Sequence, residues 1–229
     1  MQQSQKYVPM LFSTPMVKAI LNGIKTETRR IVKENPDFFV NCVGVFPLPI
    51  KITNGAGFYG IIKDGKEQMV KPKANVGDII WVRETFQVNY PFSNFVYKAD
   101  NVSNILNKWK PSLFMPKEAC RLFLKCVSVH AERLQDIDEQ GAISEGAEHG
   151  RYLGIGQVGG SFREGYFELW DQINGNGNTL LNPFVWVYKF EIIERPIDFL
   201  AVKYKVLKPI KSKGISCLCC QSTESHLDF

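Results

Sequence analysis

The chain has 229 residues, of which 45% are hydrophobic, 12% aromatic and 22% charged. This length and composition suffice for a substantial core, in one domain with insertions or at most two small domains. There is no run of about 18 apolar residues, and Met1–Val8 lacks the basic and then apolar layout of a secretion signal. These features exclude a membrane-spanning helix and predict a cytoplasmic protein with no membrane partner.

The net charge of +5 is concentrated near the end of the chain. Five of the 28 basic residues and two of the 23 acidic residues follow position 202, so three of the five net charges lie there. The preceding 202 residues are nearly neutral. Overall charge is therefore a weak argument for a nucleic-acid partner.

The first predicted element is a helix that begins at Ser13-Thr14-Pro15. A hydroxyl residue before the helix and a proline in its first turn are typical of helix starts. Gly23 stands where a left-handed residue ends many helices. The apolar positions of this segment are Met16, Val17, Ile20 and Leu21.

The middle of the chain is typical of β-strands. Phe58–Lys63 and Lys66–Lys71 flank Asp64-Gly65, which predicts a tight hairpin. After the turn at Gly77-Asp78, the pattern predicts further strands. They are expected within Ile79–Phe86, Phe95–Lys98, Leu122–Val129 and Phe184–Ile193.

Two helices are expected between the last of these strands. Asp136 with Glu139 predicts a capped helix from about Ile137 to Gly146, and Ser161 with Glu164 predicts another through Trp170. The glycine-rich stretch from 150 to 160 is expected to be a loop. It lacks the Gly-Lys-Ser/Thr of a phosphate-binding loop.

The sequence changes character near Pro196. Residues 1–196 are expected to form one domain, and residues 197–229 a lysine-rich and then Ser/Cys-rich flexible tail. Cys217, Cys219 and Cys220 lack the paired spacing of a zinc knuckle. The six cysteines are expected to be reduced, with three in apolar surroundings that predict burial. These three are Cys42, Cys120 and Cys126.

Many short strands with few helices predict a mainly β fold. The expected architecture is a small β-barrel with helical insertions, and an α+β sandwich is the alternative.

The segment Lys25–Arg30 carries the densest polar chemistry of the chain. Three cations, two threonines and one glutamate directly follow the first helix. Such cations and hydroxyls bind phosphate or the polar edge of a base, and a lysine of lowered pKa can act as a base. The alternative is a solvated charged turn.

The pattern Gly23-x-Lys25-x-x-Thr28-x-Arg30 resembles the Gly-x-Lys-x-x-Glu-x-Arg signature of the ASCH domain family, which has a PUA-like fold. The resemblance covers roughly residues 8 to 195 and implies RNA or nucleoside binding. The further segments that carry it are Phe12–Met16, Gly77–Glu84, Trp109–Pro116, Glu132–Ile137 and Asn182–Val187.

Thr28 departs from the glutamate of this signature. The small bacterial acetylcytidine amidohydrolases of the same fold also carry threonine there, and the resemblance implies a catalytic set of lysine, threonine and glutamate. Lys25 and Thr28 match the first two, and Glu145 is the candidate for the third, with Glu84 as its rival. Thr28 would attack an amide carbonyl with Lys25 as its base. A bend is required, because in a regular strand the two side chains point to opposite faces.

Five further residues are predicted to contact RNA or a nucleoside. Trp109 stands between Lys108 and Lys110 and could stack a base. The five residues are Arg29, Arg30, Arg83, Glu84 and Trp109. No metal site and no cofactor are predicted.

Four functions remain open at this stage. They are binding of RNA or a modified nucleoside, hydrolysis of an acylated nucleoside, metal-dependent RNA cleavage, and a non-enzymatic phage accessory role. Lys25 is expected to line a cleft, so that Lys25→Ala leaves folding intact.

Overall fold

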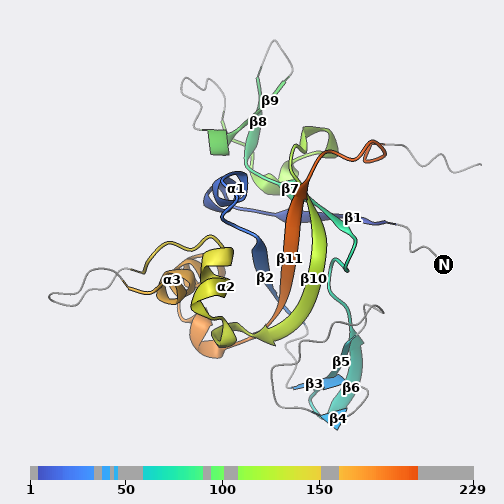
Figure 1. Cartoon of the computed structure of the whole chain (residues 1–229), viewed down its shortest axis with the longest axis vertical. Coiled ribbons are helices and arrows are strands. Elements are labelled where there is room, and N and C mark those ends of the chain that lie inside the picture. Colours follow the sequence, from blue (N-terminus) through green and yellow to red (C-terminus); the bar gives the residue numbers. More distant parts are fainter. Residues whose placement is uncertain are drawn as a thin grey trace, which may run out of the picture.

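The computed structural model describes residues 5–33, 38–41, 44–45, 59–89, 94–100, 108–150 and 160–200. These residues form eleven strands, three α-helices and several short 3-10 turns (Figure 1). The prediction of a mainly β fold with few helices is therefore confirmed. None of the helices in this part of the chain is long and apolar enough to cross a membrane.

A curved five-stranded sheet organises the molecule. Its order is β1 (Tyr7–Leu11), β7 (Ile79–Arg83), β10 (Phe123–Arg133), β11 (Phe184–Ile193) and β2 (Glu27–Ile31). β1 and β7 run parallel, and the other neighbours are antiparallel. β10 and β11 form a long curved ribbon (Figure 1). The edges of the sheet are therefore β1 and β2.

The two edges are bridged by a side chain. A terminal nitrogen of Arg30, on β2, donates a hydrogen bond of 2.7 Å to the carbonyl of Leu11, at the end of β1. No backbone ladder between β1 and β2 is present among the described strands, which form no closed barrel. The PUA-like barrel thus stays a prediction.

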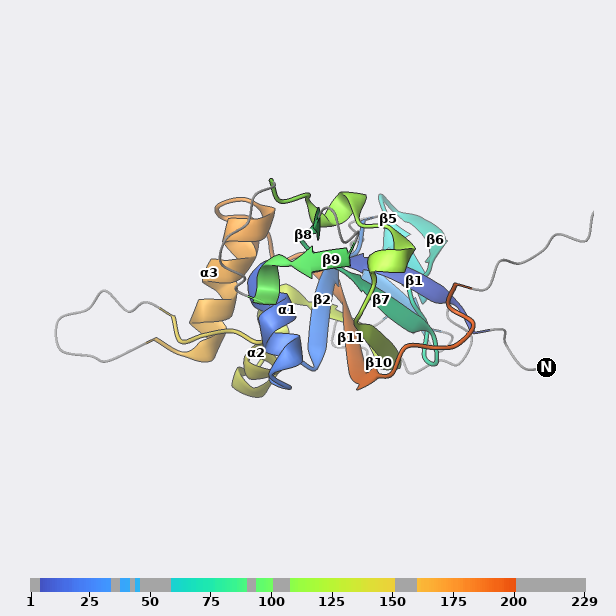
Figure 2. The same cartoon turned by 90° about the horizontal axis from the view of Figure 1, so that it is seen from above.

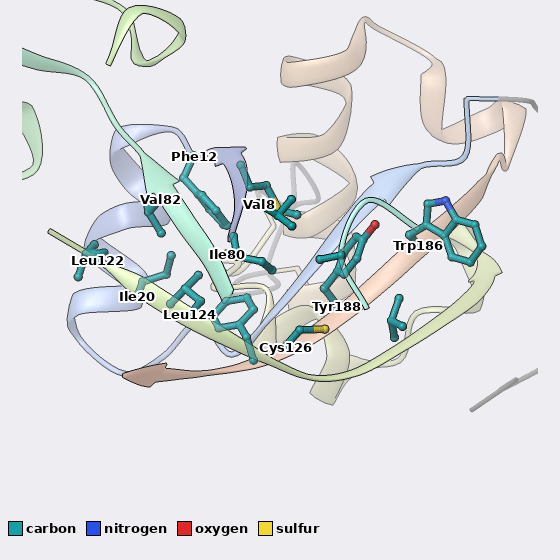
Figure 3. Packing of buried hydrophobic residues seen from close by; sticks show 14 of the residues in the cluster. Val8, Phe12, Ile20, Ile80, Val82, Leu122, Leu124, Cys126, Trp186 and Tyr188 are labelled. Atoms are coloured by element: carbon teal, nitrogen blue, oxygen red, sulfur yellow. The ribbon is translucent and has the colours of Figure 1, made fainter. Parts of the chain in front are cut away.

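Both faces of β11 are buried, which explains its nearly continuous apolar sequence. Phe184, Trp186 and Tyr188 face the central core, whereas Val185 and Val187 pack toward α2 and α3. Figure 3 shows the central core between the sheet and α1. Its labelled members include Val8, Phe12, Ile20, Ile80, Val82 and Leu124.

The three helices gather at the β2 edge of the sheet (Figures 1 and 2). α1 spans Thr14–Leu21, α2 spans Glu139–Ser144 and α3 spans Phe162–Asn174. The capping box of Ser161 and Glu164 is present at the start of α3, as predicted. The prediction for α2 was wrong by two residues, because a 3-10 turn occupies 134–136 and Asp138 supplies the cap.

A second sheet lies at the lower end of the molecule in Figure 1, away from the three helices at the left. Its order is β4-β3-β5-β6. The predicted hairpin between β5 and β6 is confirmed, with Asp64 and Gly65 at φ of 50° and 70°. The bounds are Phe38–Asn41 for β3, Gly44–Val45 for β4, Tyr59–Lys63 for β5 and Lys66–Val70 for β6.

A separate hairpin completes the described strands. It pairs β8 (Phe86–Asn89) with β9 (Asn94–Tyr97) in antiparallel fashion. Near it, the short 3-10 turn Ser112–Phe114 follows a bridge between Phe86 and Lys110.

The packed chain continues past the predicted boundary at Pro196. Phe199 is only 3% exposed and makes edge-on ring contacts with Tyr7, Trp81 and Phe123. The predicted flexible tail therefore does not begin directly after residue 196. Residues 201–229, with Cys217, Cys219 and Cys220, lie outside the described part of the chain.

Two of the cysteine predictions are confirmed. Cys120 and Cys126 are free and buried. Cys42 and the glycine-rich residues 151–159 lie outside the described residues. The ends of that stretch meet, because the amide of Gly160 donates to the carbonyl of Gly150 at 2.8 Å.

Candidate functional site

The turn from α1 into β2 places Lys25 just before the strand. Gly23 has a φ of +72°, and the amides of Ile24 and Lys25 both donate to the carbonyl of Ala19. β2 begins only at Glu27. Lys25 thus lies in the turn and Thr28 in the strand. The two side chains are therefore not bound to the alternation of one regular strand, and the catalytic hypothesis required such a bend.

Lys25 and Glu145 form a buried ion pair. The Lys25 ammonium donates to the main-chain carbonyl of Glu145 at 2.8 Å and also to its carboxylate. The two residues are 1% and 3% exposed. Burial lowers the pKa of Lys25 from its ordinary value, against the opposing attraction of the Glu145 carboxylate. Between the rival carboxylates, the geometry joins Glu145, not Glu84, to Lys25.

The close approach of Lys25 to the end of α2 depends on a glycine. Gly146 follows Glu145 and has a φ of +78°. A Cβ at this position would lie 2.8 Å from the Cβ of Ala19 and 3.3 Å from that of Lys25. A side chain here would be strained and would also separate α2 from the α1–β2 turn.

Charged residues continue from Glu145 toward the surface. Arg29 lies 3.4 Å from the second carboxylate oxygen of Glu145, and its Nε donates to Glu132 at 2.7 Å. Glu132 in turn lies 3.3 Å from Nε2 of His130. Burial disfavours the charge on Arg29, but Glu145 and Glu132 raise its pKa above the ordinary value. The guanidinium of Arg29 is thus engaged in ion pairs with Glu132 and Glu145.

Thr28 lies on the other face of β2 from Arg29. It pairs in register with Tyr188 of β11, and both side chains are buried. Its hydroxyl has no hydrogen-bond partner among the described residues. In the described part of the chain, no hydrogen bond joins the hydroxyl to Lys25 or Glu145. The structure therefore unites two members of the predicted catalytic set and leaves the third on a separate face.

The remaining predicted residues lie elsewhere. Glu84 is buried and accepts two hydrogen bonds from Arg121, at 2.9 and 3.0 Å. Arg83 donates to the carbonyl of Leu113 and lies over the ring of Trp81. Trp109 is half-buried. None of the three predicted residues borders either of the two cavities described next.

A small cavity lies along the free edge of β2, and we call it the edge cavity. Its volume is about 120 Å³. Four apolar side chains line it, namely Met16, Ile31, Leu169 and Ile173. The polar side chains that line it are Arg29, Arg30, Glu145, Tyr166, Trp170 and Asn174.

Two polar groups of the edge cavity lack partners. The Tyr166 hydroxyl and the Trp170 indole N–H are buried without a hydrogen bond to any described residue. A buried polar group without a partner costs about 1–3 kcal/mol. Both atoms have almost no accessible surface, so neither is open to the cavity. Burial raises the pKa of Tyr166 well above its ordinary value, so its hydroxyl remains a donor at neutral pH.

A larger cleft opens beside the edge cavity, between the two edges of the sheet. Its volume is about 800 Å³. Four cationic residues, Arg30, Lys33, Lys71 and Lys73, line it, and we call it the basic cleft. Its lining also includes the aromatic residues Phe12, Trp186 and Tyr188 and the hydroxyl residues Ser13, Thr85 and Ser112. No acidic residue borders it among the described residues.

The cations of the basic cleft repel one another. The pKa of Lys73 is lowered from its ordinary value, by partial burial first and then by the charges of Arg30 and Lys33, with smaller effects of Arg83 and Lys6. In addition, no carboxylate in the described part of the chain lies within ion-pair distance of Arg30. This concentration of positive charge favours an anionic ligand.

Arg30 is the one predicted site residue that lines both hollows. Lys25, Thr28 and Arg29 do not line the basic cleft. Of the residues predicted to line a Lys/Thr/Arg cleft, the basic cleft therefore contains Arg30 but not Lys25 or Thr28. The sequence reasoning missed Lys33, Lys71, Lys73 and Tyr166. The Lys71-Pro72-Lys73 segment, which follows a predicted hairpin, was the available signal for two of them.

No group of three potential metal ligands occurs among the described residues. The chain matches no protein-family model, no curated protein and no solved structure.

Proposed function

We propose that the protein binds RNA or a phosphate-bearing nucleoside in the basic cleft, as a member of the ASCH type. One observation carries this proposal: the cleft is lined by four cationic residues and by no acidic residue of the described chain. Phosphate groups are the anions that clusters of lysine and arginine bind in nucleic acids.

The size of the cleft favours a nucleotide over a simple anion. Its aromatic lining residues, Phe12, Trp186 and Tyr188, are at most 5% exposed and belong to the central core, so the cations are the groups that hold the ligand. The volume of about 800 Å³ lies within the usual range for a small-molecule site, about 300–1,000 Å³, and admits a nucleotide.

The test is a titration of a short fluorescent single-stranded RNA by anisotropy at low salt. The double variant Lys71→Ala/Lys73→Ala should weaken binding, since two phosphate contacts are lost. Lys98→Ala is the matched control, because Lys98 is exposed and does not line the cleft. If wild type binds neither RNA nor a free nucleotide at low salt, this proposal fails.

A second candidate is hydrolysis of an acylated nucleoside. The observation that favours it is the buried ion pair of Lys25 and Glu145, which are two members of the predicted catalytic set. Hydrolysis by Thr28 requires Lys25 to take the proton of the Thr28 hydroxyl, and in this structure the Lys25 ammonium lies on Glu145. Liquid chromatography of acetylcytidine incubated with the protein tests this function.

A further inference from the structure

We infer that Phe114 is a base-stacking residue at the rim of the basic cleft, where it receives one base of a single-stranded RNA whose phosphates bind in the cleft. The inference rests on the proposed function and adds to it the group that contacts the base. Three features carry it: the exposure of the Phe114 side chain, its short distance from the cleft, and the positive charge of the segment around it.

The side chain of Phe114 is open to solvent. Phe114 is 67% exposed, and among the residues whose side chains the structure describes, no other aromatic residue is as exposed. Trp109, which the sequence suggested for stacking, is half-buried, and the aromatic residues that line the cleft belong to the core. A base requires a free aromatic face on which to stack. Single exposed apolar residues are common on protein surfaces, so the position of Phe114 decides its role.

Phe114 lies in a short turn that borders the cleft. The 3-10 turn has three residues and begins at Ser112, which lines the basic cleft. Consecutive Cα atoms are about 3.8 Å apart, so the Cα of Phe114 lies within about 7.6 Å of that of Ser112. Arg83 also links the turn to the cleft. Its guanidinium donates to the carbonyl of Leu113, and its backbone pairs in register with the lining residue Leu11. A strand whose phosphates lie in the cleft can therefore bring a base to Phe114.

The turn is held in place without a ligand. The amide of Phe114 donates to the carbonyl of Pro111 at 3.0 Å, and the amide of Met115 donates to that of Ser112 at 3.2 Å. Met115 is only 2% exposed, and its sulfur accepts a hydrogen bond of 3.1 Å from the amide of Glu84. Because the backbone of the turn is already ordered, stacking on Phe114 costs little conformational entropy.

The charge around the turn suits a phosphate backbone. Residues 108–118 carry three lysines against one acidic residue, Glu118. Of these lysines, Lys110 is exposed and forms a β-bridge with Phe86, directly after Thr85 of the cleft lining. Positive charge therefore continues from the cleft to the turn, as expected where one RNA strand contacts both. Lysine is depleted in protein–protein interfaces, so these surroundings favour RNA over a protein partner at Phe114.

The experiment compares two single-stranded probes that carry the same number of phosphates. One is a short fluorescent oligouridylate, and the other is a strand of the same length without bases. In anisotropy titrations of the full chain at low salt, wild type should bind the oligouridylate about tenfold more tightly than the abasic strand, because a base stacks on an aromatic ring. Phe114→Ala should remove this difference, and Phe114→Trp should retain it. Both variants should fold, since the residue is largely exposed.

Leu180→Ala is the matched control. Leu180 is also an exposed apolar residue of a 3-10 turn, at 82%, and it lines neither the basic cleft nor the edge cavity. This variant should keep the wild-type affinity for both strands.

The outcomes separate this inference from the proposed function. Equal binding of both strands by wild type would leave phosphate binding in the cleft intact and overturn the stacking role of Phe114. A preference for the oligouridylate that persists in Phe114→Ala would overturn it as well. If that variant also loses a dimer seen by analytical ultracentrifugation, the turn binds a second copy of the chain instead. Binding of neither strand would overturn the proposed function and this inference together.

Discussion

The Lys25 ammonium reaches Glu145 twice, at its main-chain carbonyl and at its carboxylate, across 120 residues of sequence. This contact links the turn before β2 to the end of α2. It also changes what is expected of Lys25, which the sequence placed at the surface of a cleft.

Lys25→Ala should destabilise the protein, contrary to the expectation from sequence. Its loss leaves the buried Glu145 carboxylate, among the described residues, with only the 3.4 Å contact to Arg29, and it creates a cavity. Breaking a buried ion pair costs about 3–5 kcal/mol. Urea unfolding followed by circular dichroism measures this. The control Lys98→Ala should change the free energy of unfolding by less than about 0.5 kcal/mol, and an equally small effect of Lys25→Ala would contradict the burial of the pair.

The Lys25→Arg variant distinguishes a role of Lys25 as a general base from a structural role. Arginine can retain a pairing with Glu145, but its guanidinium does not release a proton near neutral pH. If Lys25 is the base of a hydrolase, Lys25→Arg should remain folded and lose cleavage of acetylcytidine. Retention of wild-type cleavage by folded Lys25→Arg would remove Lys25 from that role.

The packed domain is now expected to extend through Phe199 and not to end at residue 196. Phe199 packs among Tyr7, Trp81 and Phe123, so Phe199→Ala should cost about 3–5 kcal/mol. A chain that ends at residue 198 should lose similar stability, whereas one that ends at residue 200 keeps this contact. Thermal melts of the two truncated chains compare them directly. Equal melting temperatures would show that Phe199 contributes little.

Glu132 should make the protein sensitive to acid. Burial raises the pKa of Glu132, but the hydrogen bond with His130 and the charge of Arg29 outweigh burial and lower it. A depressed pKa contributes stability above the ordinary value near 4.5, and this stability is lost as pH falls through the lower folded value. Glu132→Gln should therefore lose about 2 kcal/mol at neutral pH and show a shallower loss below pH 4.5. Parallel acid-unfolding curves for both proteins would rule this out.

The local elements were predictable because each depends on adjacent residues. Asp64-Gly65 determines its hairpin, and Ser161 with Glu164 determines the start of α3, within a few positions of sequence. The predicted start of the helix near Ile137 failed because Asp138 competes with Asp136 as the cap.

The candidate site was predictable only in part, because it depends on contacts across the chain. Resemblance named Glu145 as the third member of a catalytic set, and the structure places its carboxylate on the Lys25 ammonium. The face on which Thr28 lies depends on the register of β2 with β11, which no local pattern specifies. Likewise, Lys73 lies in the same cleft as Arg30 through a long-range contact, because its amide donates to the hydroxyl of Tyr188, 115 residues away.

The central claim is that phosphate groups bind in the basic cleft, and the salt dependence of RNA affinity tests it most directly. Each phosphate contact releases condensed counterions, with a slope of about −0.7 per contact for single strands in a plot of log affinity against log salt. Wild type and Lys98→Ala should share one steep slope, and Lys71→Ala/Lys73→Ala should reduce its magnitude by about 1.4, for two lost contacts. An unchanged slope in the double variant, or wild-type binding that is insensitive to salt, would contradict the account.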